Sequence, residues 1–229
     1  MLSLKPVRIV DGIYDFIGNS DDDYVENYEK IARTYYEDND IDIATEAISN
    51  CVEIIIKNKP FNDEYTIIDV GSEFGYVAKN LMDWNPIVLD ISLETLKLIP
   101  NNLFRIRANA ECMPLESEWF DIVICTNLFE HVLNAEKLSY ELNRILKPGG
   151  TLLFACPWKQ DLSVYESEEY KKRFKQYKYK HLRSVDWDMI NKHFGNFHIV
   201  ASTNITVAMR SMLLTPYYVK FIQFYKGWE

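Results

Sequence analysis

Short apolar runs alternate with amphipathic segments through the middle of this chain. The predicted strands cover residues 66–70, 86–91, 103–108, 120–126 and 151–156. Between them, segments such as 134–147 repeat apolar residues at three- and four-residue spacing, which predicts helices with one buried face. Buried strands separated by such helices are typical of a parallel sheet covered on both faces. We therefore expect an α/β fold whose ligand site lies at the carboxyl ends of the strands.

The regions on either side of this alternation have a different pattern of apolar and polar residues. Residues 24–58 repeat tyrosine and isoleucine at helical spacing, which predicts N-terminal helices. After Cys156 come a polar and aromatic segment, a helix at 184–194, a strand at 197–203 and an aromatic tail. With 229 residues, the chain is long enough for one large α/β domain with additions.

Composition and charge exclude several classes of function. The formal net charge is −9, and a surface this acidic repels phosphate backbones, so we expect no nucleic-acid partner. The basic stretch 170–183 has aromatic residues at helical spacing, which favours a packed face with solvated lysines. No apolar run approaches the roughly 20 residues that span a bilayer, and residues 1–13 lack the apolar core of a secretion signal. The four cysteines have no metal-site spacing, so we expect a reduced, cytoplasmic protein without a metal.

A tight glycine turn follows the first of the apolar runs, in the stretch "TIIDVGSEFGYVAK". Gly71 comes directly after the strand, where the backbone turns sharply and can approach a ligand closely. A dinucleotide loop would also need glycine at 73 and 76, but the chain has Glu73 and Tyr76 there, which disfavours an NAD-dependent oxidoreductase. Asp90 ends the next strand, 19 positions after Gly71, where a carboxylate can accept both hydroxyls of a ribose.

Four segments taken together resemble a known family. "IIDVGSEFG", "IVLDIS", "ANAECMPLESEWFDIVICTNLFEHV" and "LKPGGTLLFACP" are similar in order and spacing to class I S-adenosylmethionine (SAM)-dependent methyltransferases. Over residues 66–157 the chain looks most like the small-molecule, type 11-like branch typified by ubiquinone and menaquinone biosynthesis methyltransferases. The resemblance implies a Rossmann-like, mostly parallel seven-stranded sheet with helices on both faces and one antiparallel strand near the C-terminus. It also implies an N-terminal helical cap over 1–60 and a SAM-binding domain over 61–229, with a lid inserted at about 157–183.

The same resemblance implies which residues hold the cofactor. Asp69 and Gly71 would shape the loop under the methionine part of SAM, and Gly75 would open the next helix. An Asn109-Ala110 pair stands where the family commonly has Asp-Ala beside the adenine, and an amide oxygen can still accept from the adenine amino group. The predicted cofactor-binding residues are Asp69, Gly71, Ser72, Glu73, Gly75, Asp90, Ile91, Asn109, Ala110 and Asn127.

Glu73 stands between the two glycines of this loop. SAM carries no phosphate, so a carboxylate there does not meet the repulsion that a dinucleotide would cause. The sulfonium and the ammonium of SAM would attract the Glu73 carboxylate, whereas the carboxylate of SAM would repel it. We therefore interpret Glu73 as compatible with SAM binding.

Catalytic and substrate-binding candidates follow from the same edge of the predicted sheet. His131, just past the fourth strand, is a candidate general base with Glu130 in support; alternatively, the pair begins a helix and organises the loop through hydrogen bonds. The predicted reaction moves a methyl group from SAM to an oxygen, or second a nitrogen, of a small organic metabolite and leaves S-adenosylhomocysteine (SAH). The alternative is a non-catalytic relative that acts through a protein partner, and the sequence leaves the oligomeric state open. The predicted substrate pocket consists of Tyr28, Tyr35, Tyr36 and Trp158.

Overall fold

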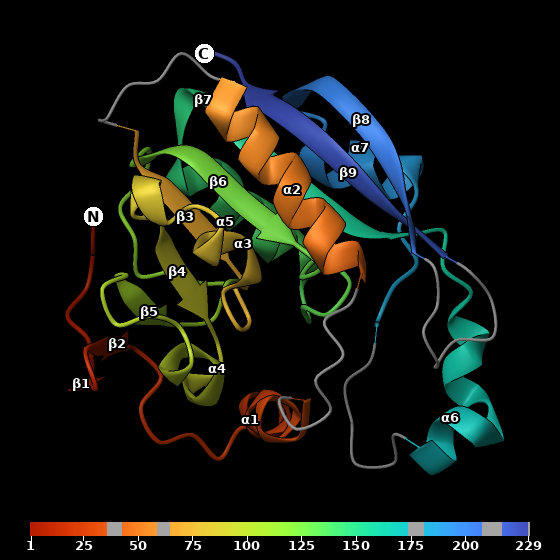
Figure 1. The fold of residues 1–229 in the computed structure, drawn as a ribbon, viewed down its shortest axis with the longest axis horizontal. Helices are drawn as coiled ribbons and strands as arrows, with labels where there is room; N and C mark the ends of the chain where they lie inside the picture. Colours follow the sequence, from red (N-terminus) through yellow and green to blue (C-terminus); the bar gives the residue numbers. More distant parts are fainter. Residues whose placement is uncertain (36–42, 59–64, 174–180, 208–216, 229) are drawn as a thin grey trace.

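The computed structural model describes residues 1–35, 43–58, 65–173, 181–207 and 217–228 (Figure 1). A nine-stranded sheet runs through this part of the chain. Its strands, in spatial order, are β1 (Arg8–Val10), β2 (Ile13–Asp15), β5 (Arg105–Arg107), β4 (Ile87–Asp90), β3 (Ile67–Val70), β6 (Phe120–Thr126), β7 (Leu146–Trp158), β9 (Tyr217–Lys226) and β8 (Phe197–Val207).

The order of the strands confirms the predicted fold class. The strands β5, β4, β3, β6 and β7 are all parallel, so the loops that follow them meet at one edge of the sheet. Strand β9 is antiparallel to both β7 and β8, which makes it the one reversed strand near the C-terminus that the sequence predicted. The order β5-β4-β3-β6-β7-β9-β8 therefore accounts for the seven expected strands.

Two strands at the N-terminal end extend this sheet beyond the expected seven. Strand β2 pairs in parallel with β5, and β1 pairs with β2 as an antiparallel hairpin. The hairpin turns at Asp11 and Gly12, which both have positive φ angles, of 51° and 75°. An Asp-Gly pair between two apolar residues is a strong hairpin signal, which the sequence analysis missed because strands of three residues show almost no alternation.

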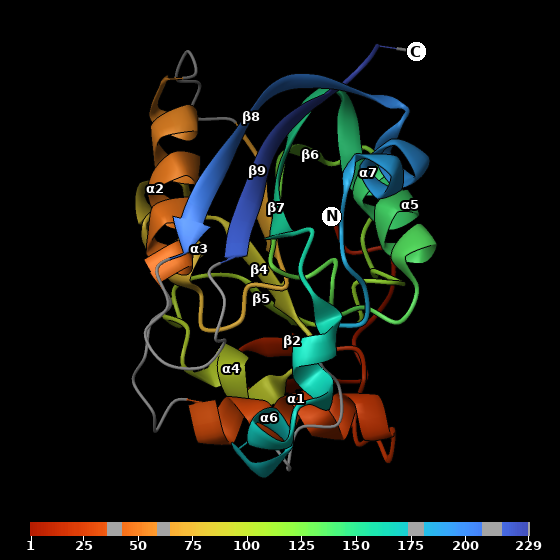
Figure 2. The same ribbon diagram turned by 90° about the vertical axis from the view of Figure 1, so that its right-hand side faces the viewer.

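Helices cover both faces of the sheet (Figure 2). On one face lie α2 (Ile43–Asn58) and α3 (Tyr76–Lys79), and on the other lie α5 (Ala135–Ile145) and α7 (Trp187–Phe194). Buried α2 residues such as Ile48 and Val52 pack against β6 and β7, while Leu138 and Leu142 of α5 join the larger core on the opposite face. Both faces of the central strands are thus buried, which explains their continuous apolar sequence.

The remaining helices lie beyond the carboxyl ends of the strands. Figures 1 and 2 both place α1 (Asp23–Tyr35), α4 (Leu93–Lys97) and α6 (Glu168–Arg173) below this edge. The described residues also form two short 3₁₀ helices, η1 (Met82–Trp84) and η2 (Leu162–Glu166). The predicted N-terminal helices and the predicted lid segment therefore both contribute helices near the expected ligand-binding edge.

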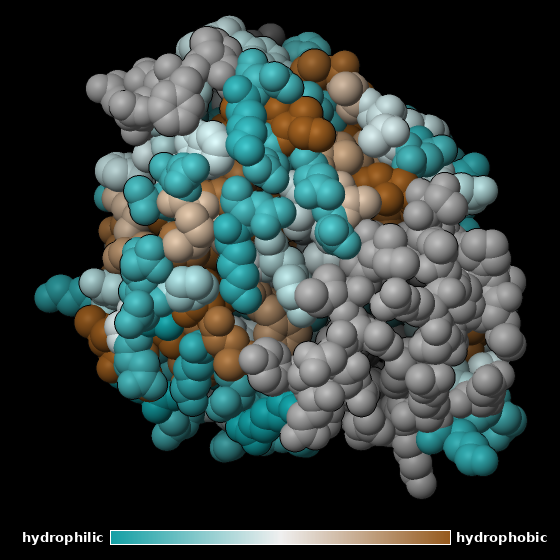
Figure 3. All heavy atoms as spheres, viewed as in Figure 1, coloured by the Kyte–Doolittle hydropathy of each residue, from teal (hydrophilic) through white to brown (hydrophobic). Residues whose placement is uncertain are grey.

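The described surface mixes polar and apolar residues. In the view of Figure 3, hydrophilic side chains surround smaller apolar areas over the face covered by α2. None of the helices in the described part of the chain is both long and apolar enough to cross a membrane.

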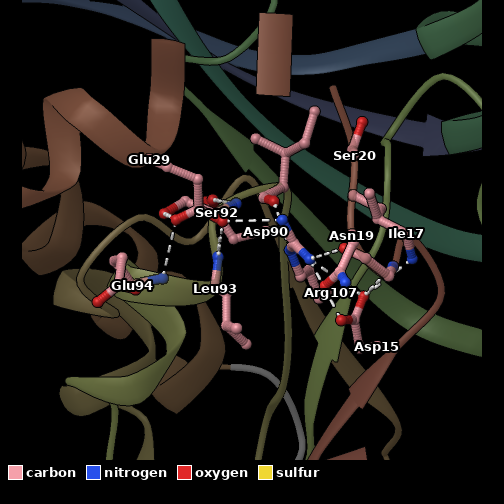
Figure 4. A network of polar contacts seen from close by, with 12 residues as sticks. Asp15, Ile17, Asn19, Ser20, Glu29, Asp90, Ser92, Leu93, Glu94 and Arg107 are labelled. Carbon is pink, nitrogen blue, oxygen red and sulfur yellow. Dashed lines mark hydrogen bonds and ion pairs between the residues drawn. The ribbon is translucent and has the colours of Figure 1, made fainter. Parts of the chain in front are cut away.

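A buried arginine joins the N-terminal segment to the sheet (Figure 4). Arg107, at the end of β5, is 4% exposed. Its Nη1 donates to the carbonyl of Gly18 at 2.7 Å and lies 3.2 Å from Oδ2 of the fully buried Asp15. Its Nη2 lies 2.8 Å from Oε1 of Glu29 on α1, and its Nε donates to the carbonyl of Ile91 at 3.1 Å. One guanidinium therefore connects β2, α1, β4 and β5.

Replacing this arginine tests how much the network contributes to stability. We expect Arg107→Met to lower the free energy of unfolding by about 3–5 kcal/mol, because it leaves the Glu29 carboxylate without its buried cation and leaves Asp15 with only the part-exposed Arg8, whose Nε lies 2.7 Å from its Oδ2. Urea denaturation measures the difference. Arg33→Met is the matched control, because Arg33 lies 3.6 Å from Glu94 and its side chain is 64% exposed, so we expect a change below about 1 kcal/mol. Equal effects of the two substitutions would contradict the role given to Arg107.

Candidate active site

The turn after β3 depends on two glycines. Gly71 has a φ of +73°, and a Cβ atom there would lie 2.8 Å from Cδ2 of Leu128. Gly75 has a φ of +70°, and its Cβ would lie 3.1 Å from Ile99. Residues with side chains rarely adopt these backbone angles, so the conformation itself requires glycine at both positions. The N–H of Gly71 donates to the carbonyl of Leu89 at 2.8 Å, which fixes the turn against the neighbouring strand.

Glu73 connects this turn to the end of β4. Its backbone N–H donates to Oδ2 of Asp90 at 2.8 Å. Its φ of 49° lies in the left-handed region, where a residue with a side chain is less stable than glycine by roughly 1 kcal/mol. The position therefore keeps the backbone shape that a second glycine would adopt, and the structure brings Glu73 and Asp90 together.

Asp90 is oriented by backbone and side-chain donors. It is 9% exposed, and besides the Glu73 N–H it accepts the N–H of Ser92 at 2.9 Å and the hydroxyl of Thr95 at 3.3 Å, both on Oδ1. Burial raises the pKa of this carboxyl above its usual value, with the nearby Glu29 adding to the effect. A carboxylate has about four lone-pair directions, so Asp90 retains acceptor capacity for a ligand hydroxyl.

Three buried polar atoms next to this carboxylate lack partners. Oδ2 of Asp69, Oγ of Ser72 and Oδ1 of Asn127 are sealed from solvent and have no hydrogen-bond partner within the described residues. They lie at the carboxyl ends of β3 and β6, which are adjacent strands. Leaving such an atom unpaired costs about 1–3 kcal/mol, so the arrangement fits a polar ligand that supplies the missing hydrogen bonds.

The charges of two carboxyl groups, on Asp69 and Asp90, interact at this edge. Burial raises the pKa of Asp69 to about 7, and the charge of Asp90 contributes in the same direction. A ligand with positive charge would relieve this repulsion, whereas a phosphate would increase it. These oxygen atoms and carboxyl groups therefore fit the sulfonium and ammonium of SAM better than they fit a dinucleotide.

The residues predicted to flank the adenine lie at the ends of the next strands. Oδ1 of Asn109 accepts the N–H of Glu111 at 2.8 Å, which closes a tight turn after β5. Ala110 is buried beside it. The carbonyl of Ile91 is occupied by Arg107, as described above. Asn109 keeps its amide hydrogens and one lone pair for a ligand.

A second polar cluster lies past the end of β6. Glu130 is 1% exposed, and neither of its carboxylate oxygens has a hydrogen-bond partner among the residues that the structure describes. The ring of His131 lies edge-on to the ring of His181, with 4.6 Å between centroids, and edge-on to Tyr28 at 6.2 Å. One donor atom each from Glu130, His131 and His181 lies within 4.8 Å of the other two.

Burial dominates the protonation of this cluster. It raises the pKa of Glu130 to about 8, and it lowers the pKa of His131 to about 4 with a contribution from the charge of Arg183. The pKa of His181 is also lowered well below its usual value by burial. Both imidazoles are therefore neutral near pH 7, and each offers one lone pair.

The segment that contains His181 is held to the loop after β6. The N–H of Leu182 donates to the carbonyl of Glu130 at 2.8 Å. Arg183 donates from Nη2 to the carbonyl of Val132 at 2.6 Å and from Nη1 to the carbonyl of Phe129, and its guanidinium lies over the Phe129 ring. His181 and Arg183 were not among the predicted site residues, because their positions in the sequence give no local sign of contact with residues 129–132.

The predicted substrate pocket is described only in part. Tyr28 contacts His131, as given above. Trp158 ends β7 and packs against Trp187 at 5.1 Å between ring centroids, with Nζ of Lys220 5.2 Å from its own ring. Tyr35 is the last residue of α1, and Tyr36 lies outside the described residues. The pocket therefore stays a prediction.

Residues 68–154 match the family described as a methyltransferase domain. Over these residues the chain is similar to the class I SAM-dependent methyltransferases. SAM is the cofactor of that family, and SAH is its product. The matched residues include β3, β4, β5 and β6 with the turns that follow them, where Asp69, Asp90 and Asn127 lie.

Individual relatives agree with this assignment. An uncharacterized protein of Methanocaldococcus jannaschii is 31% identical over 150 residues, which is 66% of this chain and 63% of that protein. A protein of Shewanella named ubiquinone/menaquinone biosynthesis C-methyltransferase UbiE is 29% identical, over 59% of this chain and 54% of that protein. The chain thus spans less than two thirds of the length of these curated relatives.

A solved structure extends the likeness over most of the chain. The SAM-dependent methyltransferase of Thermotoga maritima, named as a possible histamine N-methyltransferase, superimposes with a TM-score of 0.62 and 17% identity. The superposition covers 88% of this chain and 99% of that protein. At this identity the likeness establishes the fold alone.

The raised pKa of Asp69 leads to a prediction about pH and stability. A carboxyl whose pKa rises from about 4 in the unfolded chain to about 7 in the folded protein holds its proton more tightly when folded. Its stabilising effect is therefore present below pH 4 and is lost as the pH rises through 7. Between pH 5 and pH 8, the free energy of unfolding of the wild type should fall relative to that of Asp69→Asn by roughly 2–3 kcal/mol.

Urea denaturation at the two pH values measures this difference, since titrating groups that do not interact with Asp69 contribute equally to both proteins. Asp83→Asn, which changes an exposed carboxylate in η1, serves as the control and should follow the wild type. A pH dependence that is the same in Asp69→Asn and wild type would show that Asp69 is ionised alike in the folded and unfolded chains.

Proposed function

We propose that this protein is a SAM-dependent methyltransferase that transfers a methyl group to an oxygen of a small organic metabolite, with nitrogen as the second choice. The observation that supports it most is the ordered carboxylate of Asp90, tied to the loop by the Glu73 N–H, beside unpaired buried atoms of Asp69, Ser72 and Asn127. This set lies at the carboxyl edge of a sheet with the class I strand order.

Each part of SAM has matching residues at this edge. Asp69, Gly71, Ser72 and Asn127 would hold the methionine part, where unpaired oxygens can accept from its ammonium. Asp90 would accept the ribose hydroxyls. Glu73 would lie beside the sulfonium or ammonium, and Gly75 begins the following helix. Ile91, Asn109 and Ala110 would flank the adenine.

The bound cofactor supplies a methyl group that its sulfonium already activates, so the protein contributes mainly alignment and exclusion of water. Helices α1 and α6 lie beyond the same edge and would cover the acceptor (Figure 2). The rings of Tyr24 and Tyr28 pack edge-on to each other at 5.0 Å, with Tyr28 against His131. Aromatic rings of this kind suit contact with an organic acceptor.

The names of the relatives leave the acceptor atom open. The Shewanella relative is named for C-methylation and the Thermotoga neighbour for a possible N-methylation. Labelled SAM and a panel of phenols, hydroxylated metabolites, amines and activated carbon acids would identify the acceptor. The predicted roles of His131 as a base and of Glu130 in its support depend on that acceptor.

Calorimetric titration with SAH, SAM and NAD in parallel tests the proposal. We expect micromolar binding of SAH and SAM and no binding of NAD, because two carboxylates at the loop repel a pyrophosphate. Asp90→Asn should weaken SAH binding at least about tenfold by removing one acceptor for the ribose hydroxyls, whereas Asp83→Asn should leave it unchanged. Circular dichroism confirms that each variant is folded. A wild type that binds neither SAM nor SAH would favour the non-catalytic alternative.

The unusual residue of the loop gives a separate prediction. Glu73→Gly keeps the N–H that donates to Asp90 and adopts a positive φ without strain, so SAH affinity should be equal to or tighter than that of the wild type. Gly71→Val, at a neighbouring positive-φ position, is the contrasting variant and should lose binding. A loss of tenfold or more in Glu73→Gly would show instead that the Glu73 carboxylate contacts the cofactor directly.

A further inference from the structure

Three side chains of metal-binding type converge beside the proposed acceptor site. Glu130 and His131 come from the loop after β6. His181 comes from the segment in which Arg183 donates hydrogen bonds to carbonyls of this loop. One donor atom from each lies within 4.8 Å of the other two. His181 lies about 50 positions after Glu130 and His131 in the sequence, so only the fold brings it to them.

The cluster contains buried polar atoms without hydrogen-bond partners. Both oxygens of Glu130 and Nδ1 of His131 are sealed from solvent and lack hydrogen-bond partners in the part of the protein that the structure describes. The nearby guanidinium of Arg183 is directed to the carbonyls of Phe129 and Val132. Several buried polar atoms without partners have a high desolvation cost, which a bound cation would offset once the Glu130 carboxyl gives up its proton.

The orientation of His181 is already set by a second residue. Its Nδ1 is hydrogen-bonded to Oε1 of Gln160, and an amide oxygen can only accept, so Nδ1 carries the proton. Nε2 of His181 therefore has the free lone pair. Gln160 is itself 8% exposed and donates from Nε2 to the hydroxyl of Tyr165 at 3.1 Å. Metal-bound histidines are commonly oriented by a hydrogen bond of this kind to an oxygen behind them.

We propose that Glu130, His131 and His181 form a site for a divalent transition-metal ion, best matched by Zn²⁺. Two imidazole nitrogens and one carboxylate oxygen are the three-ligand set of zinc sites that keep a coordination position open. Mg²⁺ and Ca²⁺ prefer oxygen ligands throughout, so they fit this set poorly. Bonds of about 2.1 Å would place the three donors roughly 3.4 Å apart, a change that small side-chain rotations achieve.

The position of the site gives it a chemical role. It lies past the end of β6, where Asn127 lies at the proposed cofactor edge, so an acceptor oxygen could occupy the open position. A neutral imidazole has a single lone pair, so His131 cannot both bind the ion and act as the general base predicted from the sequence. The proposal also goes against the sequence-based expectation of no metal. It does not depend on SAM binding.

Zinc binding to the full chain tests the proposal. The purified protein, freed of metal with a chelator, is titrated with ZnCl₂ by calorimetry, and its metal content is measured after dialysis. We expect about one equivalent of tightly bound zinc and no comparable binding of Mg²⁺. Glu130→Gln and His181→Gln should each weaken zinc binding by about 100-fold or more, and Gln160→Leu by about 10- to 100-fold.

Two control variants separate this site from adventitious binding. Cys112→Ser removes an exposed thiol, and His198→Gln removes an exposed imidazole on β8, so neither should change the affinity for zinc. In the wild type, Co²⁺ used as a coloured substitute should give the visible absorption of a four- or five-coordinate site, and Glu130→Gln should lose it. Zinc affinity that is equal in His181→Gln and wild type, or that disappears in Cys112→Ser, would overturn the proposal.

SAH binding to the same samples tests the proposed function separately from the metal site. SAH titrations are run with the metal-free protein and with the zinc-loaded protein. Binding of SAH without binding of zinc would refute the metal site alone and leave His131 free to act as a base. Binding of zinc without binding of SAH would support the metal site and count against the methyltransferase proposal.

Discussion

The buried guanidinium of Arg107 organises the end of the molecule on which the cofactor edge depends. Its partners come from a strand that precedes the central sheet, from helix α1 and from the backbone beyond β4. Because a buried cation needs its hydrogen bonds satisfied in every direction, these elements are held at fixed distances from one another. Glu29, one of the partners, also accepts from the hydroxyl of Ser92 and from the N–H groups of Leu93 and Glu94, so it caps α4 directly behind Asp90. The N-terminal helix is therefore part of the scaffold that orients the proposed ribose-binding carboxylate.

The proposed cofactor edge combines sharp backbone turns with unsatisfied polar atoms. Parallel strands bring the ends of β3, β4 and β6 together, and the positive φ angles at Gly71, Glu73 and Asn127 turn the chain sharply there. Folding alone would not favour buried oxygens without partners or two neighbouring carboxyl groups with raised pKa values. Such features are typical of a site whose complement is a ligand with positive charge and several hydrogen-bond donors.

The acceptor side is built in a different way, from segments that are distant in the sequence. Arg183, at the end of the predicted lid segment, binds carbonyls of the loop after β6, and this contact brings His181 next to Glu130 and His131. Aromatic rings of α1 close the cluster on another side, through Tyr28. A metal ion at this point would complete a wall that otherwise consists of buried acceptors.

The sequence by itself determined the α/β class, the limits of most central strands and the two halves of the cofactor loop. Strand β6 covers the predicted residues 120–126, β3 starts one residue later than predicted, and β4 is one residue shorter than predicted at each end. Local chemistry decides these features, because apolar runs, glycine turns and strand-end carboxylates act over a few neighbouring residues. The Asp11-Gly12 hairpin was also readable in principle, but its strands are too short to show a periodic pattern.

Only the tertiary structure decided which distant side chains meet. The partners of Arg107 lie between 16 and 92 positions away in the chain, and His181 lies 50 positions after His131. No pattern in the sequence encodes such contacts, since they arise when the crossover connections bring separate loops to one edge of the sheet. The pKa values of Asp69 and Glu130 likewise follow from burial, a property of the packed molecule.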